Sequence, residues 1–361
     1  MCNFDCDHCY FRHKEDQTYL LRPQFMDRET VKAFAYQLGD YIEHTNLKHV
    51  NILFHGGEPL LQSPDFYDYA TAVIRTSLPS TCRPDFCLQT NGSLLNDEII
   101  AMLYRNQISV SLSIDGPESA QDRHRLYANG KSSYKAVTSN IYRLMETPMG
   151  IEIYNGILAV VDLRNDPIEV FNTIKQFSTP KTGIDFLWPD GNFSAPPPGV
   201  TDFRSDSRYA DWMIPIFDAW YSQVDQGLSI RIFENIITLL LGGRSDVEGL
   251  GEQELSVLTI ETDGEIRDSD VLAVAYNNAS RFGKGFNIHY DSIRGLLESR
   301  DFKQHETDCE HCQECQECSW NDVCGGGLLP HRYSEENQYN NPSIYCGNLR
   351  KLFQHIREVI S

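Results

Sequence analysis

Two hydrophobic patterns alternate along the first half of the chain. Short apolar runs such as residues 50–53 indicate buried strands. Longer segments place apolar residues every three or four positions, as Val31, Phe34, Leu38 and Ile42 do within residues 28–46, and indicate amphipathic helices. Strands and helices that alternate in this way predict βαβ units around a parallel sheet, so the expected fold class is α/β.

The predicted elements continue at regular spacing to residue 188. We expect helices at 28–46, 65–74, 96–104, 133–145 and 166–177, and strands at 50–53, 85–92, 108–116, 151–161 and 184–188. Glu58, Asn91, Ser113 and Asp115 fall at the carboxyl ends of predicted strands, which is where parallel barrels carry their chemistry.

The pattern changes after residue 188. Residues 189–200 contain three consecutive prolines followed by glycine and predict a loop. Helices are expected at 209–221 and 231–241, and a hairpin at 255–266 with Asp263-Gly264 as its turn. We therefore expect an α/β domain over residues 1–200, a helical bridge over 201–250 and a C-terminal domain over 251–361.

Composition narrows the class of protein. The chain has 361 residues, of which 41% are hydrophobic and 23% charged, as in ordinary soluble globular proteins. A net charge of −20 argues against a nucleic-acid partner; it is compatible with a basic peptide, or simply with a solvated acidic surface. No apolar run is long enough to span a membrane and no signal peptide is visible, so the eleven cysteines predict metal ligation in a reducing cytoplasm.

The first cysteines form the pattern Cys2-x3-Cys6-x2-Cys9, followed directly by Tyr10. A cubane iron–sulfur cluster needs a thiolate on each iron, so three cysteines leave one iron open for a substrate or cofactor. The alternative is a zinc knuckle that lacks a fourth ligand. A second motif, Phe54-His55-Gly56-Gly57-Glu58-Pro59, favours the cluster, because its glycines permit close approach of a ligand and Glu58 offers a carboxylate to an ammonium group.

Together the cysteine loop and the strand ending in Gly56-Gly57-Glu58-Pro59 resemble the radical S-adenosylmethionine (SAM) superfamily. The resemblance implies a partial (β/α)6 barrel in which Cys2, Cys6 and Cys9 hold a [4Fe–4S] cluster, SAM chelates the fourth iron, and the second motif holds the SAM amino group. Such barrels usually have a strand before the cluster loop. That strand is not in this sequence, so we expect the chain to be partial or to lack it.

The resemblance also implies further contacts with SAM. Ser113 and Asp115 resemble the SAM-contacting strand end of the family, and Arg125 is expected to reach the SAM carboxylate. For Arg125 the alternative is membership of a surface salt-bridge run at residues 122–125. The full set of expected cofactor contacts is Tyr10, Gly56, Gly57, Glu58, Asn91, Ser113, Asp115 and Arg125.

Six cysteines crowd into the C-terminal region, at positions 309, 312, 315, 318, 324 and 346. The alternative to an iron–sulfur site is a structural zinc ribbon. The spacing of Cys315, Cys318 and Cys324, with Cys346 in the distant last position, resembles SPASM domains, the cluster-binding extensions of radical SAM peptide-modifying enzymes. The resemblance implies that these four cysteines hold an auxiliary [4Fe–4S] cluster.

The sequence also departs from the SPASM pattern. Leu328 stands where the next cysteine is expected, and neither arm of the Asp263-Gly264 hairpin carries a cysteine, so we expect one auxiliary cluster rather than two. Cys309 and Cys312 complicate this prediction, because with Cys315 and Cys318 they form a ferredoxin-like run. They are candidates to replace ligands or to hold a further metal.

Several stretches resemble the FxsB/XYE/GRR-type peptide maturases, among them His331-Arg332-Tyr333 and Asn341-Pro342-Ser343-Ile344-Tyr345-Cys346. The resemblance implies modification of a ribosomal precursor peptide: the 5′-deoxyadenosyl radical removes a Cβ hydrogen, and an aromatic side chain is joined to that carbon in a three-residue cyclophane. The auxiliary cluster is either the electron acceptor or a structural anchor, and a flavodoxin or ferredoxin is the expected reductant.

Proton removal needs a base, for which Asp263, Asp268 and Asp270 are candidates, although turn or surface roles are the alternative. Three other functions stay open. A sulfatase-type maturase would oxidise a cysteine or serine to formylglycine on the same fold, against which the missing inner-cluster ligands count. A thioether-forming maturase is the second, and a non-catalytic iron–sulfur or zinc-binding protein is the third.

Overall fold

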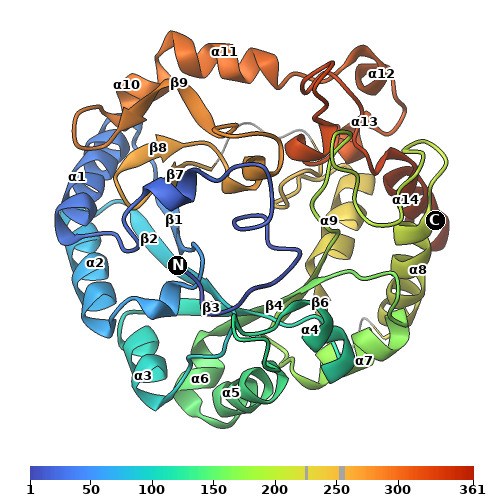
Figure 1. Cartoon of the computed structure of the whole chain (residues 1–361), viewed down its shortest axis with the longest axis horizontal. Coiled ribbons are helices and arrows are strands. Elements are labelled where there is room, and N and C mark those ends of the chain that lie inside the picture. Colours follow the sequence, from blue (N-terminus) through green and yellow to red (C-terminus); the bar gives the residue numbers. More distant parts are fainter. Residues whose placement is uncertain (224–226, 252–256) are drawn as a thin grey trace.

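The computed structural model describes residues 1–223, 227–251 and 257–361, and its centre is a six-stranded sheet (Figure 1). The strands follow the order β1-β2-β3-β4-β5-β6, and every neighbouring pair is parallel. An α/β fold with a parallel sheet was predicted from the sequence and is confirmed.

The elements of the barrel region have the following bounds. The strands are β1 (His49–Phe54), β2 (Arg83–Thr90), β3 (Ile108–Ser113), β4 (Tyr154–Val160), β5 (Gly183–Leu187) and β6 (Ser229–Ile230). The helices are η1 (Thr18–Leu21), α1 (Arg28–Thr45), η2 (Pro59–Leu61), α2 (Pro64–Ser77), α3 (Asp97–Arg105), α4 (Glu118–His124), α5 (Tyr134–Glu146), α6 (Pro148–Ile153), α7 (Pro167–Gln176), α8 (Arg208–Tyr221) and α9 (Arg231–Leu240).

The C-terminal part adds a small antiparallel sheet and short helices. Its strands are β7 (Thr259–Ile260), β8 (Glu265–Arg267) and β9 (Arg281–Asn287), and its helices are η4 (Asp270–Val274), α10 (Ile293–Leu297), α11 (Arg300–Asp308), α12 (Gln313–Gln316), α13 (Asn321–Cys324), η5 (Leu329–Arg332) and α14 (Cys346–Ile360). The predicted hairpin is present as β7 and β8, although residues 255 and 256 lie outside the described part of the chain.

The predicted helices and strands of the barrel are confirmed with one correction. Residues 151–153 belong to helix α6 and not to the strand that follows it. Pro148 begins this short helix and the Thr147 side chain accepts a hydrogen bond from the Gly150 N–H, so a local cap outweighs the apolar pattern. The structure also adds α4, β9, α10 and α11, which we did not predict.

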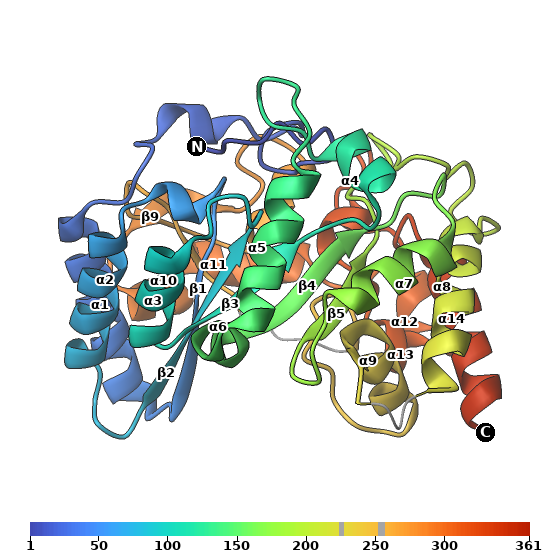
Figure 2. The ribbon, with the colours of Figure 1, turned by 90° about the horizontal axis from the view of Figure 1, so that it is seen from below.

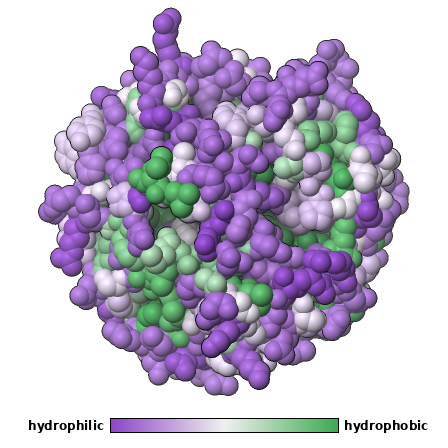
Figure 3. All heavy atoms as spheres, in the orientation of Figure 1, coloured by the Kyte–Doolittle hydropathy of each residue, from purple (hydrophilic) through white to green (hydrophobic). Residues whose placement is uncertain are grey.

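The two faces of the large sheet differ in burial. Ile52, Phe86 and Val110 point toward the surrounding helices and are buried. On the other face Leu53 is 57% exposed and Leu187 is 37% exposed. Figures 1 and 2 show helices around the outside and the N-terminal loop lying across the carboxyl end of the strands. In Figure 3 the rim of this end is mostly hydrophilic, with hydrophobic patches inside the rim. The face of the sheet that carries Leu53 and Leu187 is therefore partly accessible to solvent.

Within the described residues, no helix combines the length and the apolar character that crossing a membrane requires.

Candidate active site

Three parallel strands deliver polar residues to the same edge of the sheet. β1 ends just before His55 and leads to Glu58, β2 ends just before Asn91, and β3 ends two residues before Asp115. Because these strands are neighbours, their carboxyl ends lie side by side beneath the N-terminal loop, which is the arrangement expected from the sequence.

The cysteine loop, residues 2–9, is fixed to these strand ends by hydrogen bonds. The Glu58 N–H donates to the Met1 carbonyl at 2.8 Å, and the Asn91 side chain donates to Asn3 at 2.8 Å. The Asn91 amide nitrogen also lies 3.9 Å from the Cys2 sulfur. The structure thus brings the two motifs of the sequence into direct contact.

Gly57 is required by this contact. A Cβ atom at Gly57 would lie 2.2 Å from the Met1 carbonyl oxygen, a separation that real side chains do not adopt. Gly56 has a φ of +130°, a conformation that favours glycine. Gly56 is therefore needed for its backbone conformation and Gly57 for the close contact. Together they let the strand approach the cysteine loop.

Glu58 is 3% exposed and its carboxylate is held by three donors. The Thr90 hydroxyl donates at 2.7 Å, the Asn91 N–H at 2.9 Å and the Leu60 N–H at 3.0 Å. Burial raises the pKa of Glu58 despite these bonds. Its Oε2 accepts only the Asn91 bond among those described, so acceptor capacity is left for a cationic ligand.

Asp115 and Arg125 form a buried pair next to the cysteine loop. The Arg125 Nε donates to Asp115 at 2.8 Å, and the Val160 N–H donates to the other carboxylate oxygen at 2.9 Å. Burial opposes charge on Asp115, but Arg125, His8 and the Val160 N–H together outweigh burial and lower the pKa of Asp115. Arg125 is 9% exposed, so the surface salt-bridge alternative is wrong for this residue.

Arg123, Ser113 and Cys6 lie near this pair in the sequence or in the site, and each has a different environment. Arg123 does join a surface ion pair, with Asp162 at 2.6 Å. The Ser113 hydroxyl accepts a bond from the Gln89 amide at 2.9 Å. Burial raises the pKa of Cys6 to about 12, the Arg125 charge opposing the rise, so the thiol stays protonated until a metal displaces its proton.

The three candidate bases have different surroundings. Asp263 accepts a bond from Arg22 at 2.8 Å and from the Glu265 N–H at 3.1 Å, which stabilises the hairpin turn. Asp268 is 1% exposed and lies 2.6 Å from the His305 Nε2.

Asp270 instead contacts Tyr10, the residue that follows the cysteine loop, and His55 of the second motif. The Tyr10 hydroxyl donates to its carboxylate at 3.2 Å, and the His55 Nδ1 lies 3.4 Å away. Burial, followed by the Asp270 charge, raises the pKa of Tyr10. Burial opposes charge on His55, but Asp270 outweighs it and raises the pKa of His55. Asp270 is therefore the candidate base that the structure places at the site.

Sequence reasoning missed Glu248, His55 and His305. Glu248 lies in a loop without motif, and the Ser269 hydroxyl lies 3.4 Å from its carboxylate. Burial, together with Asp268 and Asp270, raises the pKa of Glu248 to about 7 although Ser269 opposes the rise. His55 belongs to the second motif, but the motif by itself assigns no role to its side chain. No sequence signal marks Glu248 or His305, because their partners come from distant segments.

The C-terminal cysteines gather around η5 and the start of α14. Cys324 is influenced electrostatically by Cys346 and Cys318, and Cys315 by Cys312 and Cys324. Burial raises the pKa of Cys324 to about 12. The four cysteines predicted to hold the auxiliary cluster thus share one region, which also includes Cys312.

Within the described residues, the cysteine sulfurs do not form a group of three close enough to hold a single metal ion. Ligand sulfurs around one zinc ion lie about 3.8 Å apart. Within the described residues, the one group of three potential ligand atoms within 4.8 Å of one another is Asp7, His8 and His124. No three cysteine sulfurs are that close, whereas a four-iron cluster keeps its ligand sulfurs farther apart.

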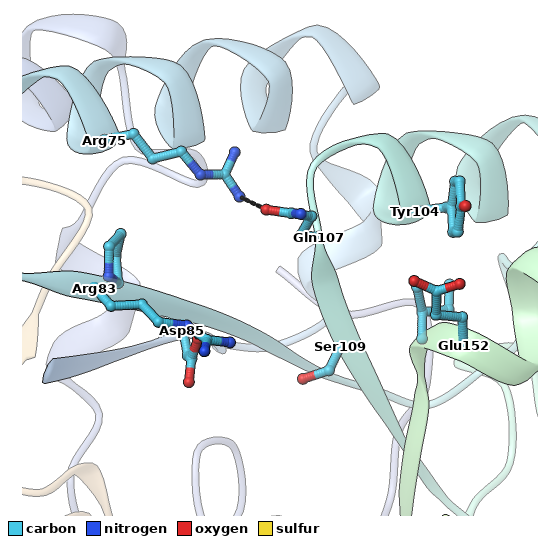
Figure 4. Close-up of a pocket in the computed structure, with 9 residues that line it drawn as sticks. Arg75, Arg83, Asp85, Tyr104, Gln107, Ser109 and Glu152 are labelled. Atoms are coloured by element: carbon cyan, nitrogen blue, oxygen red, sulfur yellow. Dashed lines mark hydrogen bonds and ion pairs between the residues drawn. The ribbon is translucent and has the colours of Figure 1, made fainter.

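A cavity at the opposite end of the sheet is not part of this site. It has a volume of 430 Å³ and is lined by Arg75, Arg83, Asp85, Gln107 and Glu152 among others (Figure 4). Arg83 is the first residue of β2, so this cavity lies at the amino end of the strands, away from Glu58 and Asn91.

Comparison with known proteins identifies the class. Residues 1–166 match the family model described as the radical SAM superfamily. Residues 1–166 are therefore a radical SAM domain. SAM and [4Fe–4S] clusters are the cofactors of this class, as predicted, whereas the residues that hold them stay a prediction.

Relatives with assigned names extend over most of the chain. A cysteine-type anaerobic sulfatase-maturating enzyme of Clostridium perfringens is 24% identical over 98% of this chain and 93% of its own length. A serine-type enzyme of Bacteroides thetaiotaomicron is 26% identical over 75% of this chain and 67% of its own length. The predicted likeness to cyclophane-forming maturases is not shown by these relatives.

Solved structures agree on the fold. The native enzyme anSMEcpe with bound AdoMet and the Kp18Cys peptide matches all of this chain and 95% of its own, with a TM-score of 0.81 and 22% identity. Streptococcus suis SuiB bound to S-adenosylmethionine matches with a TM-score of 0.58 and 13% identity. The first match confirms that the whole chain shares the fold of that enzyme, whereas the SPASM-like character of the C-terminal part stays a prediction.

Proposed function

We propose that this enzyme oxidises the Cβ of a cysteine or serine in a peptide to the aldehyde of formylglycine. The observation that carries the proposal is the position of Asp270, which projects from the C-terminal part to the cysteine loop and contacts Tyr10. The full-length likeness to cysteine-type and serine-type sulfatase-maturating enzymes supports the same chemistry. This was the alternative and not the main prediction from the sequence.

We assign the cofactor ligands from the same geometry. Cys2, Cys6 and Cys9 would hold the SAM-binding cluster, with Gly56, Gly57 and Glu58 at the SAM amino group. Asp115 and Arg125 form the opposite wall, and Tyr10, Asn91 and Ser113 complete it. Cys315, Cys318, Cys324 and Cys346 would hold the auxiliary cluster.

The chemistry requires removal of a hydrogen atom, a proton and an electron. When bound, the cofactors supply a 5′-deoxyadenosyl radical that takes a hydrogen atom from Cβ. Asp270 would accept the proton of the substrate thiol or hydroxyl, because it is the candidate carboxylate that reaches the loop. The cluster that the auxiliary-site cysteines would hold could supply the acceptor for the electron. A serine thus becomes an aldehyde directly; a cysteine becomes a thioaldehyde that water converts to the aldehyde, releasing hydrogen sulfide.

A second candidate is the cyclophane cross-link predicted from the sequence. It is favoured by the absence of inner-cluster ligands, since Leu328 occupies the expected cysteine position and no cysteine lies on β7 or β8. A peptide that offers a cysteine, a serine and an aromatic residue distinguishes the two functions.

The experiment uses the anaerobically reconstituted enzyme, dithionite, SAM and such a peptide. Formylglycine reacts with a hydrazide probe, whereas a cyclophane loses hydrogen without gaining a carbonyl and yields a cross-linked fragment in tandem mass spectrometry. A product without a carbonyl contradicts the formylglycine proposal. Absence of 5′-deoxyadenosine would contradict both functions and revive the non-catalytic alternative.

A further inference from the structure

Arg332 differs from the other buried arginines of this chain. It lies at the end of η5 and is 2% exposed. Arg125 and Arg267 are also buried, and each has a carboxylate partner, Asp115 at 2.8 Å and Glu265 at 2.8 Å. Within the described residues no carboxylate lies within ion-pair distance of Arg332. A buried charge without a partner is costly, so its presence needs an explanation.

Neutral acceptors surround the guanidinium of Arg332. Its Nε donates to the Tyr339 carbonyl at 3.1 Å, its Nη1 donates to the Cys309 carbonyl at 3.0 Å, and its Nη2 donates to the carbonyls of Glu310 and Tyr339. These bonds satisfy the donors and fix the orientation of the group. They do not neutralise its positive charge.

The ionisable groups with the largest electrostatic effect on the Arg332 guanidinium are thiols. They are Cys315, Cys309, Cys312 and Cys324, in order of their effect on the guanidinium. Two of them, Cys315 and Cys324, belong to the set that we assign to the auxiliary cluster. A thiol is neutral, but metal ligation converts it to a thiolate, and a four-iron cluster with four thiolates carries net negative charge. The missing counter-ion is therefore supplied when the cluster is present.

We propose that Arg332 is the internal counter-ion of the auxiliary cluster and raises its reduction potential, so that the cluster accepts the electron released by the peptide. This inference rests on the proposed auxiliary-cluster ligands. One electron leaves the substrate radical and enters the oxidised cluster, while one proton passes to the carboxylate base; an external ferredoxin-type carrier then removes the electron. The added electron makes the cluster more negative, and a fixed cation stabilises that state more than the oxidised one.

Arg350 provides a matched control. It is also close enough to act electrostatically on a proposed ligand, Cys346, but it is exposed to solvent. Water screens an exposed charge far more than a buried one. If proximity of any arginine sufficed, removal of either residue would have the same effect. If burial of the charge matters, Arg332 alone should control the potential.

The test is a redox titration followed by electron paramagnetic resonance on the reconstituted full-length chain. A Cys2→Ala/Cys6→Ala/Cys9→Ala background isolates the auxiliary signal. We expect Arg332→Gln to move the midpoint potential to more negative values at unchanged iron content, Arg332→Lys to remain near the wild-type midpoint, and Arg350→Gln to leave it unchanged. In the enzyme with all clusters, Arg332→Gln should still cleave SAM but form less peptide product per SAM.

Two results would overturn the inference. One is an unchanged midpoint in Arg332→Gln that retains its iron, and the other is an equal shift in Arg350→Gln. If Arg332→Gln loses the cluster, Arg332→Lys decides, because it keeps the charge but not the forked bonds; a lowered midpoint there would show that the bonds and not the charge matter. Absence of any auxiliary signal in the background chain would instead contradict the proposed ligands.

Discussion

The two cysteine groups differ in the balance of the buried charges around them. Glu58 lies near Cys2 and Asp115 lies near Cys6, and the Arg125 cation beside Cys6 is paired with Asp115. The C-terminal group instead faces the buried cation Arg332. A site bordered by carboxylates suits the ammonium and sulfonium charges of a bound SAM, whereas a site with an internal cation suits a resident anionic cluster. The difference teaches that cysteine spacing alone does not define the task of a cluster; the fixed charges around it do.

The largest effect is expected when the cysteines of either group are replaced, because the first group should serve SAM cleavage and the second should serve peptide oxidation. Cys2→Ala/Cys6→Ala/Cys9→Ala should abolish 5′-deoxyadenosine formation and remove about four irons per chain. Cys318→Ala/Cys346→Ala should also remove iron but retain SAM cleavage and lose peptide oxidation. Chromatography of 5′-deoxyadenosine and an iron assay check both, with Cys82→Ala/Cys87→Ala as a control that leaves both activities intact. Loss of SAM cleavage in Cys318→Ala/Cys346→Ala would contradict the assignment of different tasks to the two cysteine groups.

Asp270 belongs to the C-terminal part of the chain but contacts Tyr10, next to the first cysteine group. Its replacement therefore tests whether peptide oxidation can be separated from SAM cleavage. Asp270→Asn should lower the rate of peptide product formation by about 10²- to 10⁴-fold, the usual contribution of a general base, while SAM cleavage continues. Asp263→Asn is the matched control, because Asp263 pairs with Arg22 away from the loop. Equal losses in the two variants, measured by mass spectrometry of the peptide, would refute the assignment of Asp270.

Glu58 tests the carboxylate surroundings of the first group. Glu58→Gln removes the charge and places an amide where the Asn91 N–H now donates. Losing a hydrogen bond to a charged group costs about 1.5–3 kcal/mol, so we expect SAM affinity to fall by roughly ten- to a hundredfold. Equilibrium binding of SAM measures this effect. Unchanged affinity in a folded variant would exclude contact between Glu58 and SAM.

The smallest expected effect concerns His305, which is next to the second group. Burial alone would lower the pKa of His305, but bonding to Asp268 and then to the Cys309 thiol raises it to about 10. Because this folded-state pKa is above the unfolded value of about 6.5, the stabilisation is complete below about pH 6.5 and is lost as the pH rises toward 10.

Thermal unfolding of His305→Gln checks this dependence. We expect a loss on the order of 1–3 kcal/mol at about pH 6 and a much smaller loss at about pH 9.5. A difference from the wild type that does not change with pH would show that His305 acts by packing and not by charge.

The sequence predicts the elements that have a periodic apolar pattern and the positions where the chemistry allows few residue types. Apolar periodicity located the barrel elements, and the cysteine loop with Gly56-Gly57-Glu58 located the cofactor end, because glycines and thiols have few substitutes there. It could not choose among Asp263, Asp268 and Asp270. They lie within eight positions of one another, and only tertiary contacts with Arg22, His305 and Tyr10 separate them.

Long-range contacts also explain the residues that were missed. The sequence shows Arg332 only as part of a likeness, because its four carbonyl acceptors are backbone groups, whose contacts leave no side-chain pattern in the sequence. Residues 151–153 were assigned to a strand because their apolar run hides the cap at Thr147. In each case the deciding interaction joins groups that the linear pattern does not relate.

The segment that follows the cysteine loop, residues 10–23, is joined by ion pairs and a hydrogen bond to the hairpin of the C-terminal part. Arg22 pairs with Asp263 and Glu265, and Asp16 pairs with Arg267. The Thr262 hydroxyl also donates to the Pro23 carbonyl at 2.7 Å. Protein engineers who exchange C-terminal domains between related enzymes should therefore transplant residues 10–23 together with the hairpin, since a chimera that keeps only one of them would lose these ion pairs.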